Sequence, residues 1–274
     1  MARIGELFGT DGVRGIANEE LTPEMAMNLG RVMGTLRSRV AIAMDTRISS
    51  SMLKSAVIAG LTSCSCDVVD LGIAPTPALQ YYVKCKDEID GGIAITASHN
   101  PREYGGIKFI QEDGREFTRK MDEECEKIYK SKSFKIVRWD KIGQVYYDDY
   151  KRLYINGILS KVDREKIAES NFRVVIDCGN GASYITSPYI LKELGCEVIS
   201  INAHPDGRFP QRNPEPVEEN VLLLKKVVKD VNADLGIAHD GDADRSAAID
   251  YKGKLIEWDS FLAVLAYGLS LIHI

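Results

Sequence analysis

The sequence lacks several patterns that would place it at once in a class of protein. None of its six cysteines forms a CxxC pair, so we expect reduced structural thiols, with no zinc site and no disulfides. The chain has no basic segment and a net charge of −5, which argues against a nucleic-acid partner. Its longest uncharged apolar run, residues 261–274, is shorter than the roughly 20 residues of a membrane helix. The first residues are charged and contain no apolar core of a signal peptide, so we predict a cytoplasmic protein without a membrane partner.

Several catalytic motifs are missing as well. There is no GxxxxGK[ST] segment, which excludes a P-loop nucleotide site. Ser98 is not in a GxSxG pattern, which argues against a serine hydrolase. The segment CGNGASY, residues 178–184, has GxG without a third glycine. A tight strand-to-helix turn is therefore a better interpretation there than a dinucleotide site.

Short apolar strands alternate with helical segments along the chain. We expect strands at residues 40–44, 68–71 and 93–97, a helix over 50–65, and another that begins at Thr22 and Pro23. Strands of this kind, separated by helices, are typical of a parallel sheet covered on both faces. The predicted fold class is α/β, with two tandem three-layer α/β/α domains whose sheets are mixed but mostly parallel.

The second half repeats the plan of the first. An apolar strand leads to Asp45 in the first half and another leads to Asp177 in the second. The strand at 92–94 runs on into Ser98, and its counterpart at 236–238 runs into Asp240. If these strands are equivalent, both polar loops lie at carboxyl ends of strands, where open α/β sheets place their ligands. Chance similarity of short apolar strands is the alternative.

We predict a first domain over residues 1–154, a second over 155–256, and the start of a third over 257–274. Residues 144–170 are charged and rich in tyrosine at first and then helical in pattern. They are expected to form a connecting helix between the two complete domains.

The segment DGDADR carries three alternating carboxylates, Asp240, Asp242 and Asp244. In an extended segment this spacing would place all three on one side. Clustered carboxylates repel one another unless a cation neutralises them, and oxygen ligands in a tight loop suit Mg²⁺. An EF-hand is excluded, because its glycine and glutamate positions hold Arg245 and Tyr251. A solvated acidic turn is the remaining structural alternative.

Ser98 ends an apolar strand and begins the turn SHNP. It makes chemical sense as a phosphate carrier, because phosphoserine bears about −1.5 to −2 charges and could share a Mg²⁺ with the aspartates. Lys108 and Arg14 could supply positive charge or protons to a sugar hydroxyl. His99 could do the same, or it could be only a hydrogen-bonding neighbour of the serine.

At this point the sequence resembles the α-D-phosphohexomutase family. The resemblance is carried by motifs that occur in the family's order. They are FGTDGVRG (8–15), DTR (45–47), APTPAL (74–79), TASHNP (96–101), GIKF (106–109), VVIDCGNGA (174–182), FPQRNPEP (209–216) and DGDADR (240–245). FGTDGVRG is most similar to the phosphoglucosamine mutase branch, and the wider pattern also resembles the phosphomannomutase/phosphoglucomutase type.

The resemblance implies an enzyme that interconverts hexose or hexosamine 1-phosphates and 6-phosphates through a hexose 1,6-bisphosphate. It implies that Ser98 is the phosphorylated serine and a metal ligand. It also implies that the three aspartates hold Mg²⁺, that Arg14 and Lys108 assist phosphoryl and proton transfer, and that Arg245 lies at the same site. His99, next to the serine, is a further candidate.

Two features depart from the family pattern. Gly105 stands where asparagine is expected before GIK, and we expect it to add flexibility to a loop that carries Lys108. Neither a GExSG-like sugar loop nor a late serine-rich phosphate loop is present, so we expect a mutase that lacks its C-terminal domains and is weak alone. Two alternatives stay open: a metal-dependent phosphatase with Asp240 as nucleophile, and an inactive remnant that keeps the fold.

Overall fold

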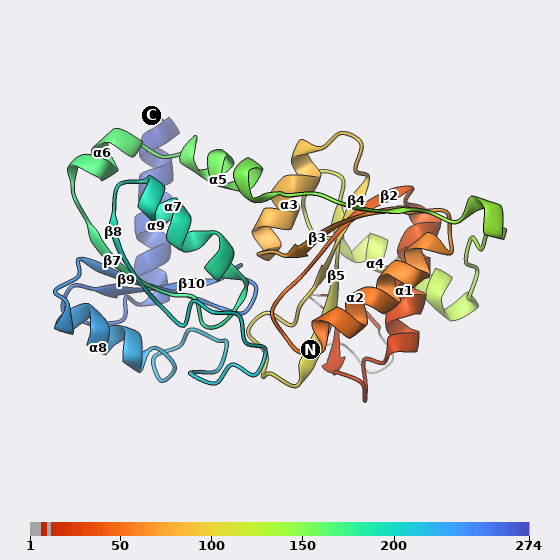
Figure 1. Ribbon diagram of the computed structural model, residues 1–274, viewed down its shortest axis with the longest axis horizontal. Coiled ribbons are helices and arrows are strands. Elements are labelled where there is room, and N and C mark those ends of the chain that lie inside the picture. Colours follow the sequence, from red (N-terminus) through yellow and green to blue (C-terminus); the bar gives the residue numbers. More distant parts are fainter. Residues whose placement is uncertain (1–6, 10–11, 274) are drawn as a thin grey trace.

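The computed structural model describes residues 7–9 and 12–273. Two sheets with their helices lie side by side, joined by a helical connection (Figure 1). All six cysteines are free thiols in this structure. Within the described residues, no helix has the length and apolar character needed to cross a bilayer.

The first sheet contains all three strands that were predicted in the first half, together with three others. Its strands are β1 (Val13–Ile16), β2 (Arg39–Met44), β3 (Asp67–Ile73), β4 (Gly91–Ile95), β5 (Tyr104–Gln111) and β6 (Val145–Tyr147). Their order is β1-β5-β4-β2-β3-β6, and β5 runs in the direction opposite to the other five of these strands. The strand predicted over 93–97 ends at Ile95, because the backbone turns at Thr96 to begin the serine loop.

Helices cover both faces of this sheet, as the α/β/α prediction requires. They are α1 (Pro23–Leu36), α2 (Ser50–Thr62), α3 (Thr76–Cys85) and α4 (Arg119–Ser131). Helix α1 begins as predicted, with Pro23 in its first turn and the Thr22 hydroxyl accepting a hydrogen bond from the Met25 amide at 3.3 Å. Helix α2 ends at Thr62, before the predicted residue 65, and Ser65 then has a positive φ of 64°.

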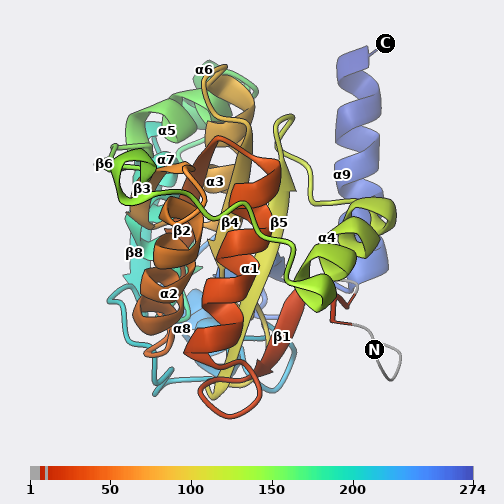
Figure 2. The same cartoon turned by 90° about the vertical axis from the view of Figure 1, so that its right-hand side faces the viewer.

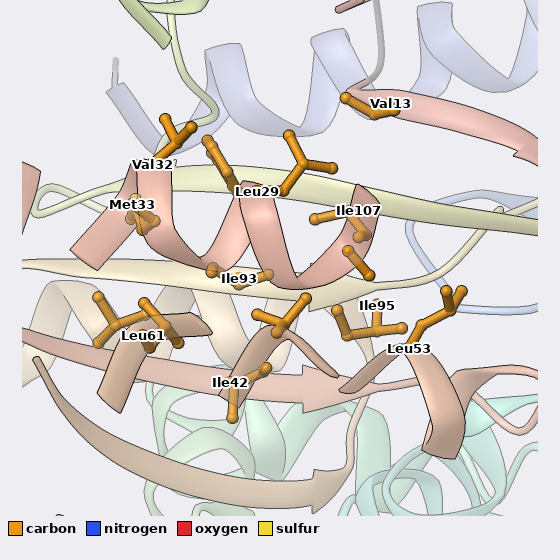
Figure 3. Packing of buried hydrophobic residues seen from close by; sticks show 14 of the residues in the cluster. Val13, Leu29, Val32, Met33, Ile42, Leu53, Leu61, Ile93, Ile95 and Ile107 are labelled. Atoms are coloured by element: carbon orange, nitrogen blue, oxygen red, sulfur yellow. The ribbon is translucent and has the colours of Figure 1, made fainter. Parts of the chain in front are cut away.

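Alternation along β2 divides the core between the two faces. Val40 and Ile42 point toward α1 and α2, where they join the cluster seen in Figure 3. Ala41 and Ala43 point to the opposite face and pack with α3. Helices α1 and α2 lie next to each other (Figure 2), and a Cβ on Gly60 would come within 2.1 Å of the Met27 carbonyl oxygen.

The second sheet repeats the central part of the first. Its strands are β7 (Arg173–Asp177), β8 (Glu197–Ile201), β9 (Leu235–His239) and β10 (Ser246–Asp250), in the order β10-β9-β7-β8. Strands β7, β8 and β9 are parallel and β10 is antiparallel to β9. This matches β5-β4-β2-β3 strand for strand, so the predicted repeat is confirmed. Each domain therefore has its third parallel strand, β4 or β9, in the equivalent position.

Helices flank the second sheet too. They are η2 (Ala182–Ile185), α7 (Ser187–Glu193), α8 (Leu222–Asp230) and α9 (Trp258–His273). Helix α8 packs on one face through Leu224 and Val228. Helices α7 and α9 line an apolar cavity of about 520 Å³ on the other face. Much of α9 is exposed, including Leu262 and Tyr267.

Helix α5 (Lys151–Leu159) connects the two domains, preceded by η1 (Trp139–Lys141) and followed by α6 (Arg164–Glu169). Tyr150, just before α5, is buried in the core of the first domain. Ile155 and Leu159 pack against Ile190 and Leu194 of the second. The predicted boundary between residues 154 and 155 therefore falls within a helix that contacts both domains, and it stays a prediction.

Candidate active site

The site is formed where the loop after β4 meets the loop after β9. These are the two equivalent strands of the repeat, so both loops lie at carboxyl ends of parallel strands, where the sequence placed them. Each of the three aspartates in the second loop accepts a hydrogen bond from a different residue of the first domain. The pairs are Ser98–Asp240 at 2.6 Å, Thr76–Asp242 at 2.5 Å and Lys108–Asp244 at 3.0 Å.

The acidic loop is a turn between β9 and β10 and not an extended segment. Ala243 has a φ of +59°, which reverses the chain between Asp242 and Asp244. The expectation that extended alternation would align the three carboxylates was therefore wrong. The three side chains still converge, and ligand oxygens of Asp240, Asp242 and Asp244 lie within 4.8 Å of one another.

Crowding and burial make these carboxylates electrostatically unusual. Burial, reinforced by the charges of Asp242 and Asp244, raises the pKa of Asp240 well above its ordinary value. Burial and the neighbouring Asp244 raise the pKa of Asp242 to about 6. Burial alone would also raise the pKa of Asp244, but the ion pair with Lys108 outweighs it and the pKa is lowered. Ionisation of all three carboxylates together would place more negative charge here than Lys108 alone can balance.

The residues fit a divalent cation. Asp242 is 1% exposed, and its Oδ1 is buried with no hydrogen-bond partner among the described residues. A buried carboxylate oxygen without a partner is costly, and a cation would satisfy it. Three carboxylates from one tight turn supply the oxygen ligands that Mg²⁺ prefers.

Ser98 is buried and held in an uncommon backbone conformation. Its φ is +50°, in the left-handed region, and its amide donates to the Thr96 hydroxyl at 2.9 Å. Its Oγ lies 2.6 Å from Asp240 Oδ2 and 3.3 Å from His99 Nδ1. His99 thus contacts the serine, and its role as acid, base or hydrogen-bonding neighbour stays a prediction.

Lys108 reaches the site from the middle of a strand. It lies on β5 opposite Ala94 of β4, and its side chain is 2% exposed. The expectation of a flexible loop at Gly105 was wrong, because Gly105 pairs with Gly15 inside the sheet. Both Gly105 and Gly106 lie in β5, where a Cβ would come within 2.7 Å of Leu53 Cδ1 or 2.2 Å of the Thr96 carbonyl oxygen.

The two predicted arginines lie at the rim of the same site. Arg14, on β1, donates from Nη1 to Asn100 Oδ1 at 2.6 Å and so contacts the serine loop. Thr10 and Asp11 of the same FGTDGVRG motif lie outside the described residues. Arg245 donates from its amide to Asp240 Oδ1 at 3.2 Å, and its side chain is 43% exposed. That exposure leaves its guanidinium accessible to a molecule that enters the site.

Arg47 was not assigned a role from the sequence, yet it holds the serine loop. Its fully buried guanidinium pairs with Asp45 at 3.0 Å. It also donates to four carbonyl oxygens of the loop. These belong to Ser98 (2.8 Å), Asn100 (2.7 Å), Pro101 (2.6 Å) and Tyr104 (3.2 Å). The sequence feature that could have pointed to Arg47 is Asp45, which ends a predicted strand at the edge of the sheet where the site forms.

Comparisons with known proteins identify both domains. Residues 5–136 match the phosphoglucomutase/phosphomannomutase alpha/beta/alpha domain I, and residues 152–253 match domain II of the same family. The chain is 48% identical over 270 residues to a phosphoglucomutase/phosphomannomutase of Thermococcus kodakarensis, covering 96% of this chain and 59% of the relative. It is 46% identical over 260 residues to a probable phosphoglucosamine mutase of Methanosarcina barkeri, covering 94% and 58%.

A solved structure gives the same result. The fold is similar to a phosphoglucomutase/phosphomannomutase family protein from Burkholderia thailandensis, with a TM-score of 0.83 and 27% identity. The match covers 91% of this chain and 56% of that protein. The chain thus spans somewhat more than half the length of the relatives it matches. Its domains, their order and their sequence place it in the α-D-phosphohexomutase family.

Proposed function

We propose that this chain provides the phosphoserine and the metal site of a phosphohexomutase. The reaction would interconvert hexose or hexosamine 1-phosphate and 6-phosphate through a hexose 1,6-bisphosphate. One observation carries the proposal: the Ser98 hydroxyl lies 2.6 Å from Asp240 inside a cluster of three carboxylates and a buried lysine. Relatives named for glucosamine, glucose and mannose phosphates all match, so the sugar is left at the level of hexose or hexosamine.

The chain's own residues suit a phosphoryl transfer. When the serine is loaded, the bond from phosphorus to a sugar oxygen breaks and a bond from phosphorus to Ser98 Oγ forms. The hydroxyl proton leaves toward Asp240 Oδ2, which already accepts it at 2.6 Å. The sugar oxygen takes up a proton, for which the candidate donors are His99 beside Ser98, Lys108 beside Asp244, and Arg14 and Arg245 at the rim. Transfer in the opposite direction rephosphorylates the sugar and returns the proton to Ser98.

A divalent cation completes the site in this proposal. Asp240, Asp242 and Asp244 would hold it, with phosphorylated Ser98 as a further ligand. When bound, Mg²⁺ supplies charge neutralisation for the phosphoryl group. Lys108, buried beside Asp244, keeps a positive charge at the same place.

Sugar binding is expected to be the weak point of this chain alone. The relatives are longer than the region that it matches. Correct positioning of a substrate contributes about 7–11 kcal/mol to reactions of this kind. We therefore expect phosphorylation of Ser98 to be retained while full turnover between the 1-phosphate and the 6-phosphate is slow.

Intact-mass spectrometry of the purified chain tests the proposal. The chain is measured before and after incubation with glucose 1,6-bisphosphate and Mg²⁺, with Ser98→Ala as the matched control. We expect a gain of one phosphoryl group that is absent in Ser98→Ala. A gain that persists in Ser98→Ala would favour the phosphatase alternative with Asp240 as nucleophile. No gain in the wild-type chain would contradict the proposal.

A further inference from the structure

Thr76 stands out among the residues that contact the acidic loop, because it makes two hydrogen bonds to one aspartate. Its hydroxyl donates to Asp242 Oδ2 at 2.5 Å, and its amide donates to the Asp242 carbonyl oxygen at 2.9 Å. Thr76 is 3% exposed and Asp242 is 1% exposed, so water does not compete at this contact. Together the two bonds fix both the backbone and the carboxylate of Asp242.

The carboxylate that results has two different oxygens. Oδ2 is occupied by Thr76, whereas Oδ1 is buried with no hydrogen-bond partner in the described part of the chain. The threonine thus restrains rotation of the carboxylate and leaves one buried oxygen, Oδ1, without a hydrogen bond from the described residues. An oxygen fixed in this way is prepared for a cation, because little freedom remains to be lost on binding.

Thr76 is itself rigidly placed. It is the first residue of α3 and lies between Pro75 and Pro77, both of which restrict the backbone. Ala78, Leu79 and Tyr82 anchor the same helix in the core of the first domain. In Figure 1, α3 lies on the side of the first sheet that faces the second domain.

The other two contacts, Ser98 with Asp240 and Lys108 with Asp244, involve groups that react or that have other partners. Ser98 loses its hydroxyl hydrogen when it is phosphorylated, so it can no longer donate to Asp240. Lys108 divides its charge among Asp244 at 3.0 Å, Glu116 at 3.6 Å and Asp242 Oδ2 at 4.0 Å. The Thr76 hydroxyl, in contrast, neither takes part in the proposed transfer nor carries a charge shared with other acidic residues.

We infer that Thr76 is a positioning residue for the divalent cation and that it links cation binding to contact between the two domains. This deepens the proposed function and depends on it for the identity of the site. Because the threonine belongs to the first domain and its aspartate to the second, a cation that favours the fixed carboxylate also favours the docked domains. By linkage, separation of the domains weakens the cation site by the same factor.

Binding of Mn²⁺ and of Mg²⁺ to the purified, unphosphorylated 274-residue chain tests this inference. Thr76→Val keeps the branched shape and removes the hydroxyl, and Thr76→Ser keeps the hydroxyl as the matched control. Isothermal titration should show affinity about 10–100-fold weaker for Thr76→Val and within about threefold of wild type for Thr76→Ser. Circular dichroism in EDTA verifies that each variant is folded.

A second measurement needs no variant. In the wild-type chain, hydrogen exchange of the Thr76 amide should slow when Mn²⁺ or Mg²⁺ is added, because that amide bonds to the Asp242 backbone. Wild-type affinity in Thr76→Val, or unchanged exchange at residue 76 on cation binding, would overturn the inference. In that case phosphorylation of Ser98 could still occur, so the proposed function would stand. Absence of any cation binding to the wild-type chain would overturn the inference and the metal part of the proposed function together.

Discussion

Ser98 Oγ and Asp240 Oδ2 lie 2.6 Å apart although 142 positions separate them in the chain. The serine follows the third parallel strand of the first domain, and the aspartate follows the equivalent strand of the second. The two domains share one βαβαβ plan, but the loops that follow their equivalent strands differ. The loop of the first domain carries a nucleophilic oxygen, and the loop of the second carries acidic ligands. Neither domain alone contains the site, and its chemistry depends on how the two domains meet.

Removal of Arg47 should destabilise the protein strongly. Arg47→Ala leaves a buried Asp45 without its ion pair and four loop carbonyls without their donor. Loss of one partner of a buried pair costs about 3–5 kcal/mol in free energy of unfolding. Urea denaturation measures this, with Arg152→Ala as an exposed control whose partner is Glu193. Equal effects of the two substitutions would contradict the role of Arg47 as the support of the serine loop.

The stability of the metal-free chain should depend on pH through the aspartate cluster. Folding raises the pKa values of Asp240 and Asp242, that of Asp242 to about 6. The pKa of an aspartate in the unfolded chain is about 4. The folded chain then binds more protons than the unfolded chain in this window, so this contribution to stability falls as pH rises through it. A bound cation removes the penalty.

Mg²⁺ should therefore raise the melting temperature more at about pH 7.5 than at about pH 5. Differential scanning fluorimetry with and without Mg²⁺ at the two pH values gives the comparison. Asp242→Asn should reduce the difference, because it removes one of the raised carboxyl groups and a cation ligand. A larger effect of Mg²⁺ at the lower pH would contradict the electrostatic account.

Gly106→Ala should destabilise the first sheet and disturb Lys108. A Cβ at position 106 would lie 2.2 Å from the Thr96 carbonyl oxygen, so β4 and β5 would have to separate. Overpacking of this kind costs about 1–3 kcal/mol. Gly268→Ala is the control, because nothing lies within 4 Å of a Cβ there and alanine favours a helix. Chemical denaturation should show a loss for Gly106→Ala and none for Gly268→Ala.

Lys108→Met tests whether the lysine and a bound cation neutralise the same carboxylates. The buried lysine is the ammonium group paired with Asp244 and lies 4.0 Å from Asp242. Without it the metal-free chain should lose about 3–5 kcal/mol of stability, as expected for a broken buried pair. Mg²⁺ should restore much of this loss, since a cation then meets less repulsion in the site. If Mg²⁺ stabilises Lys108→Met less than it stabilises wild type, the lysine does not compete with the cation.

Much of the architecture could be predicted from the sequence. Short apolar strands, helix starts such as Thr22-Pro23 and the repeated endings at Asp45 and Asp177 indicated two α/β domains. The strand that holds Lys108 could not be assigned, because paired glycines at 105 and 106 are as typical of turns as of closely packed strands. The residues next to a glycine in the sequence do not show which distant backbone atoms it will contact in the fold.

Only part of the site could be predicted, because some of its residues follow apolar strands and others act through long-range contacts. Ser98 and the aspartates follow apolar strands, which gave their position at one edge of a sheet. Thr76 and Arg47 act through contacts with residues distant in sequence or with backbone carbonyls, and such contacts leave no periodic signal. The turn at Ala243 was missed because alternation predicts an extended segment, whereas a hairpin also brings the three carboxylates together.

The central claim is that both domains together place a phosphoryl group on Ser98. The most direct test is to incubate the chain with ³²P-labelled glucose 1,6-bisphosphate and map the label by peptide sequencing, in wild type and in Asp242→Asn. We expect hydroxylamine-stable label on the peptide that contains Ser98, and far less of it in Asp242→Asn. Hydroxylamine-sensitive label on the peptide that contains Asp240 would show an acyl phosphate there, and it would contradict the assignment of Ser98 as the phosphate carrier.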